Sequence, residues 1–148
     1  MLQSTDGARL GVERLERPKS FGPPEPWDEG EFNGRLTLDT GDESLAGYVS
    51  WIPHYVDEAV AFFDDLAAHA DGWEGTKTIR TEDDDLRLEC SHDGSTIRAT
   101  ARLLDWWDPY KENPSPYDHK ELTATMTLEP EELRRFADEF RALVGRDR

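Results

Sequence analysis

Two prolines, Pro53 and Pro130, stand where the hydrophobic period of the chain changes. Before each proline, apolar residues alternate with polar ones, which is typical of a half-buried strand; after each, apolar residues recur every three or four positions, which is typical of an amphipathic helix. Proline breaks a strand ladder but is accepted in the first turn of a helix. The sequence therefore predicts strands, a helix over 54–70, more strands, and a closing helix over 130–144.

The strands are predicted where apolar and polar residues alternate. Seven segments show this alternation, at 8–16, 32–40, 45–52, 76–81, 86–92, 95–107 and 121–128. Short turns join most of these segments, and strands joined in that way are antiparallel. We therefore expect an α+β fold, with an antiparallel sheet of about six to seven strands and two amphipathic helices packed against it. The 148 residues fit a single domain.

The two helices also align, Val56 with Leu133 and Phe63 with Phe140. An internal duplication would produce this match, and so would the general likeness of any two amphipathic helices that follow hydrophobic strands.

Residues 17–31 contain four prolines, and we expect them to form an irregular arm or long loop. Two aromatic residues of this segment, Phe21 and Trp27, are expected to pin it to the body of the protein.

The net charge of −16 is concentrated, since residues 25–93 hold 19 acidic and four basic residues, a net −15. Such a field disfavours nucleic acid and attracts basic proteins or cations, although acidity also serves solubility alone. On this ground we expect the acidic turn Asp83, Asp84 and Asp85 to form part of a partner-facing surface.

No motif declares a reaction or a cofactor. The four histidines are scattered and there is one cysteine, so no metal site is expected, and the EDDD run at 82–85 lacks the spacing of a calcium loop. Cys90 and His92 could suggest a nucleophile, but Cys90 continues an apolar strand face, so we expect a buried thiol.

The chain shows neither an apolar run of about 18 residues nor an apolar leader, so we expect no membrane span and no secretory signal. Its single cysteine, Cys90, cannot form an internal disulfide, so we expect a reducing, cytoplasmic location.

The segment 105–119 is an unusually long connection between two strands, and long ordered loops often carry function. Alternation places Trp107 on the core face and leaves Trp106, Tyr110 and Tyr117 as candidates for an exposed aromatic binding patch. The alternative is that the loop folds onto the sheet and shields these aromatic side chains.

The chain contains, in this order, the stretches FFDDLAAHADGWEG, LRLECSHDG, IRATARL and LRRFADEF. In these four stretches and in their order it resembles an uncharacterised family of short acidic bacterial proteins. The resemblance covers about residues 45–145. It implies the same order of helix, hairpin and helix, and it implies no activity or catalytic residue.

These features favour a non-enzymatic binding protein that engages a basic protein partner, in its most concrete form an immunity-type protein that neutralises a toxin. The alternative is a small ligand-binding or hydrolytic module with an aromatic and acidic pocket near the 105–119 loop.

Overall fold

The computed structural model describes residues 1–81, 84–105, 109–110 and 120–147, which form two antiparallel four-stranded sheets and two α-helices. The strands of the first sheet follow chain order: β1 (Leu2–Gln3), β2 (Arg9–Arg14), β3 (Phe32–Asp39) and β4 (Ser44–Trp51). Those of the second sheet do the same: β5 (Thr76–Arg80), β6 (Leu86–His92), β7 (Ile97–Asp105) and β8 (Lys120–Leu128). Helix α1 (Pro53–Ala68) follows the first sheet and α2 (Pro130–Leu143) follows the second.

The expected α+β class, the antiparallel pairing and the order of strands, helix, strands, helix are confirmed. The expectation of one sheet with six to seven strands was wrong, because eight strands divide between two sheets. Strand β1 has two residues, too few to leave an alternating pattern in the sequence. Alternation also shows that a strand has a buried face, but it does not show which sheet the strand joins.

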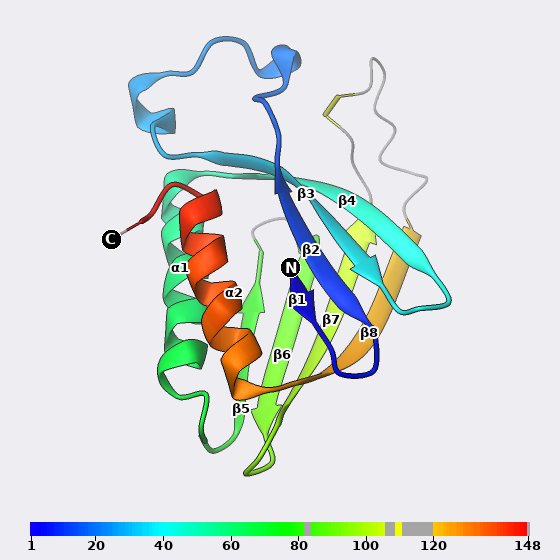
Figure 1. Cartoon of the computed structure of the whole chain (residues 1–148). Coiled ribbons are helices and arrows are strands. Elements are labelled where there is room, and N and C mark those ends of the chain that lie inside the picture. Colours follow the sequence, from blue (N-terminus) through cyan, green and yellow to red (C-terminus); the bar gives the residue numbers. More distant parts are fainter. Residues whose placement is uncertain (82–83, 106–108, 111–119, 148) are drawn as a thin grey trace.

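Each half of the chain is a four-stranded meander followed by a helix (Figure 1). Helix α2 begins at the expected Pro130, and α1 begins at Pro53, one residue before the expected start; the residues before them, Ile52 and Glu129, are extended. Proline suits this position because its missing N–H is one that a first helical turn leaves unpaired anyway. The two helices lie side by side on the same side of the strands (Figure 1).

The two sheets approach each other most closely where β4 crosses β7. Gly47 of β4 lies at this crossing, where a Cβ atom would be in van der Waals contact with Leu103 Cδ1 of β7, 3.4 Å away. The turn after β1 adds a polar link, in which Thr127 N of β8 donates to Ser4 Oγ at 2.8 Å. One hydrophobic cluster therefore draws on both sheets and both helices.

A group of aromatic rings joins the two helices and connects them to the first sheet. Phe63 of α1 lies between two rings of α2, with centroid distances of 4.8 Å to Phe136 and 4.9 Å to Phe140. Phe140 in turn contacts Trp51 of β4 at 6.3 Å, and Trp51 contacts Phe32 of β3 at 5.4 Å. These contacts fix how the second half of the chain sits against the first.

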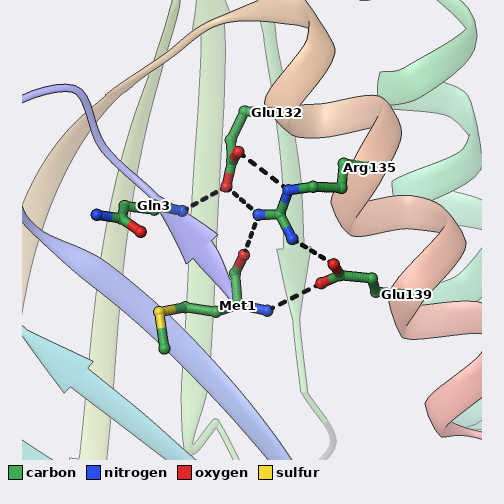
Figure 2. A network of polar contacts seen from close by, with 5 residues as sticks. All are labelled: Met1, Gln3, Glu132, Arg135 and Glu139. Carbon is green, nitrogen blue, oxygen red and sulfur yellow. Dashed lines mark hydrogen bonds and ion pairs between the residues drawn. The ribbon is translucent and has the colours of Figure 1, made fainter.

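Strand β1 is held against α2 by a polar network around Arg135 (Figure 2). Arg135 donates to the Met1 carbonyl at 2.6 Å and to Glu139 at 2.5 Å, and it also pairs with Glu132. Glu132 accepts a 2.9 Å hydrogen bond from the backbone of Gln3. Arg135 also holds the pKa of Glu139 below its usual range.

No helix in the described part of the chain is long and apolar enough to cross a membrane.

We expect Phe136→Ala to lower the free energy of unfolding by about 3–5 kcal/mol, because it empties a site between two other rings that is 2% exposed. The measurement is urea denaturation followed by circular dichroism. Phe62→Ala is the matched control, since Phe62 is only partly buried and its loss should be less destabilising. Equal losses for the two variants would show that the helix pair does not depend on this ring cluster.

Candidate functional site

The segment 17–31, called the arm below, leaves the first sheet between β2 and β3. It contains two short 3₁₀ turns, η1 (Lys19–Phe21) and η2 (Pro26–Asp28), and no longer element. Its four prolines lack the backbone donors that a strand ladder needs. The arm lies beyond one end of the sheets, near the start of α1 and the end of α2 (Figure 1).

Arg17 closes the arm at its base. Its Nη1 donates to Glu31 Oε2 at 2.5 Å, and its Nε donates to the carbonyl of Gly22 at 2.9 Å. The guanidinium also lies over the ring of Phe21, 5.5 Å from its centroid. The hydrogen bond to Glu31 raises the pKa of Arg17, which follows from stabilisation of the charged form. The two ends of the arm are thus joined, so the arm is a closed loop.

Arg146, just beyond α2, attaches the arm to the body of the protein. Its Nη2 donates to the carbonyl of Gly30 at 2.9 Å, and its Nε donates to Asp57 Oδ1 of α1 at 2.8 Å. Gly30 has a φ of +90°, and a Cβ atom there would lie 2.8 Å from Arg146 Nη2. Glycine is therefore required at this position both for its backbone conformation and for the close contact with Arg146.

The start of the 105–119 segment touches the base of the arm. The Tyr110 hydroxyl donates to the carbonyl of Glu16 at 2.5 Å, and its ring contacts Tyr48 of β4 with centroids 5.5 Å apart. Ser20 Oγ donates to the carbonyl of Pro109 at 3.3 Å. The structure therefore brings together the two irregular segments that the sequence singled out. Tyr110 is 42% exposed, so part of its ring remains available to a partner.

A cleft of about 710 Å³ separates the arm from the end of α2. Arm residues on either side of Trp27 line one wall, and Val144, Gly145 and Arg146 line the other. The arm contributes four carboxylates to the lining: Glu25, Asp28, Glu29 and Glu31. Among the described residues, neither Glu25 nor Glu29 has an ion-pair partner, and Arg14 and Arg146 line the same cleft.

Trp27 lies in η2, in the acidic half of the arm, and is 74% exposed. The expectation that it pins the arm was wrong, because Arg146 and Arg17 provide the attachment instead, while Phe21 is half-buried beneath Arg17. A tryptophan side chain exposed to water is uncommon on the surface of a monomeric protein, whereas tryptophan is common among the residues that dominate protein–protein binding. The signal in the sequence was PEPWDEGE, a tryptophan among acids and prolines with no apolar neighbour to pack against.

The acidic turn occupies a different part of the molecule. Asp84 pairs with Arg80 at 3.3 Å and with Arg102 at 3.4 Å, so its charge is partly compensated within the protein. Asp85 is 5% exposed and accepts a hydrogen bond from Thr81 Oγ1. These two acids thus have roles inside the turn.

Three predicted binding residues, Asp83, Trp106 and Tyr117, lie outside the described residues, as does Trp107, which was expected in the core.

Cys90 is fully buried, which confirms the expected core position. Burial raises the pKa of its thiol to about 12, so the nucleophilic thiolate is scarce at neutral pH. His92 is occupied elsewhere, since its Nε2 contacts the carbonyl of Ala70 at 2.8 Å and its Nδ1 accepts from Gly94 N at 2.9 Å. Its ring also lies against Trp73. The pair therefore lacks the contact that a cysteine nucleophile needs.

Among the described residues, no group of three or more His, Cys, Asp or Glu side chains is arranged to hold a metal ion.

Residues 25–147 match a family of unknown function, DUF6228. The match confirms the resemblance to an uncharacterised family and extends it to the acidic half of the arm. A search of curated proteins finds no match to the chain.

We expect Arg146→Met to speed cleavage of the arm by a glutamate-specific protease, for which Glu29 provides a site. Loss of the contacts to Gly30 and Asp57 should ease opening by about 1 kcal/mol, roughly a fivefold rate increase. Arg134→Met, which removes an ion pair with Asp71 near the other end of α2, is the matched control. Cleavage of Arg146→Met at the wild-type rate would show that Arg146 does not hold the arm.

We expect iodoacetamide to label Cys90 slowly in the native protein at pH 8 and rapidly in urea, because the thiol is buried and protonated. Mass spectrometry over time gives both rates. A Cys90→Ala/Thr78→Cys variant, with its single thiol on an exposed strand position, is the control for reagent activity. Native labelling of Cys90 as fast as that of the thiol introduced in this variant would contradict the buried position.

Proposed function

The chain belongs to this family of unknown function, and we propose that it is a non-enzymatic binding protein that engages a basic protein partner through its arm. The observation that carries the proposal is Trp27, which is 74% exposed in the η2 turn of a closed acidic loop. Exposed tryptophans of this kind are enriched among the residues that dominate binding energy in protein interfaces.

The charges around Trp27 support a basic partner. Glu25 and Glu29 stand on either side of it without ion-pair partners in the described part of the chain, and both are exposed. Acidic side chains at the rim of an interface speed association with a basic surface and give the rate a salt dependence. Asp57 and Glu58 add exposed acids at the neighbouring start of α1.

The attachment of the arm supports the same proposal. A loop that must order on binding loses affinity to the entropy of ordering, whereas a loop already fixed avoids that loss. Arg17 closes the arm, Arg146 holds its far side, and Tyr110 contacts its base. Trp27 is thus presented on a preorganised support, as a recognition residue needs to be.

The more specific form of the proposal is an immunity-type protein that neutralises a basic toxin. A small acidic scaffold with one preorganised recognition loop is sufficient for that role, because it acts by covering its target. The partner would then be encoded next to this chain.

The cleft of about 710 Å³ favours a second candidate, a ligand-binding or hydrolytic module. Its size falls within the range of small-molecule sites, and its carboxylates would supply polar contacts. A small cationic molecule that binds in the cleft with wild-type Trp27 and with Trp27→Ala alike would favour this candidate.

The partner can be identified by replacing Trp27 with the photocrosslinker p-benzoylphenylalanine in cells. Placing the same crosslinker at Thr125, which is exposed on the second sheet, gives the background. A basic protein crosslinked from position 27 and not from position 125 would then be purified for binding measurements.

We expect Trp27→Ala to weaken binding of that partner by about 2 kcal/mol, roughly 30-fold, mainly through faster dissociation. Glu25→Gln/Glu29→Gln should slow association at low salt, and the difference should shrink as salt screens the field. Asp42→Asn/Glu43→Gln is the matched control, because it removes the same charge at the opposite ends of β3 and β4 from the arm.

Surface plasmon resonance at two salt concentrations gives both rates. If both arm variants bind like wild type, the arm is not the recognition surface.

A further inference from the structure

Three arginines form a row across the outer face of the second sheet. Strand register places Arg80 of β5 opposite Arg87 of β6, and Arg87 opposite Arg102 of β7. Neighbouring residues such as Leu88 and Ala101 are buried on the inner face, so the arginines emerge on the outer face. Adjacent strands lie about 4.8 Å apart, so three positive charges occupy a width of about 10 Å.

Like charges at directly opposed positions repel, so a row of this kind requires an anion. Asp84 supplies one, since its carboxylate contacts both outer members of the row, Arg80 Nε at 3.3 Å and Arg102 Nη1 at 3.4 Å. Glu121 pairs with Arg102 from the side of β8, at 2.7 Å. Neither Asp84 nor Glu121 pairs with Arg87, the middle member of the row.

Arg87, in the middle, makes no hydrogen bond or ion pair with any residue in the described part of the chain. Its Nε is shielded from water and finds no acceptor within the ranges 1–81, 84–105, 109–110 and 120–147. A buried donor without a partner is unfavourable, and a bound ion is one of the partners that can satisfy it.

Asp84 is held over the row by a constrained turn. Its φ is +57°, and it is the only non-glycine residue with a positive φ in the described part of the chain. The flanking residues fix the turn: Thr81 Oγ1 accepts from Leu86 N at 2.9 Å, and Leu104 N donates to Asp85 O at 2.8 Å. The carboxylate of Asp84 thus occupies, from within the chain, the place that an external oxyanion would take between two guanidiniums.

We propose that Arg80, Arg87 and Arg102 form an oxyanion-binding site that takes a phosphate group, with Asp84 as its internal competitor. Guanidinium groups bind phosphate through paired, charge-assisted hydrogen bonds. A dianionic phosphate offers three terminal oxygens and more charge than one carboxylate, so it suits three arginines better than Asp84 does. The site is separate from the arm, so the proposed function can fail without affecting it.

The test measures binding of inorganic phosphate by isothermal titration at constant ionic strength. Wild type should bind weakly, Arg87→Gln about tenfold more weakly, and Asp84→Asn severalfold more tightly because the competitor is removed. Asparagine tolerates a positive φ, so the turn should persist in Asp84→Asn. Arg98→Gln, on the same face but in another row, and Asp42→Asn, in a turn of the first sheet, are matched charge controls and should bind like wild type.

Two peptides distinguish the source of the phosphate. Tighter binding of a phosphoserine peptide than of inorganic phosphate would assign the site to a phosphorylated protein, and the reverse would assign it to a small phosphate compound. A peptide with glutamate in place of the phosphoserine is the control. If it binds as tightly as the phosphoserine peptide, the assignment of the site to phosphate is overturned. Phosphate binding that is unchanged in both Arg87→Gln and Arg80→Gln, or absent even in Asp84→Asn, would overturn the site itself.

Discussion

The contact of Phe63 with Phe136 and Phe140 is the interaction on which the rest of the structure depends. Each half of the chain is a meander with one helix, and neither helix has a second helix of its own half to cover it. Packing α1 on α2 gives each helix that partner, and the contact of Phe140 with Trp51 extends the cluster into the first sheet. Because α2 is thereby fixed, Arg146 at its end is placed where it can hold the arm.

Much of the fold could be predicted because periodicity and proline report local geometry. Pro53 and Pro130 mark both helix starts, and the segment predicted at 86–92 matches β6 residue for residue. The division into two sheets could not be predicted, since it depends on contacts such as Gly47 against Leu103 between segments far apart in sequence. The halves do share one order of elements, which is compatible with the duplication that the helix alignment suggested.

Less of the candidate site could be predicted from the sequence. Whether a charged side chain is paired, and whether any side chain is exposed, depends on contacts between residues far apart in the chain. Asp84 and Asp85 stand in one acidic run, yet Asp84 meets two arginines and Asp85 turns inward. Trp27 was expected to pin the arm to the body of the protein, but it is 74% exposed, because Arg17 and Arg146 hold the arm instead. The arginine row could not be predicted from the sequence either, since strand register brings its members together from three strands.

The closure of the arm by Arg17 and Glu31 has a consequence for how this family can diversify. Both ends of the loop are fixed at the sheet, and Gly30 and Arg146 fix its far side. The residues between Phe21 and Gly30 contribute no buried side chain to the core, so their identities can change without altering strand register or helix packing. The scaffold therefore allows the sequence of the arm between Phe21 and Gly30 to vary while the same fold is inherited intact.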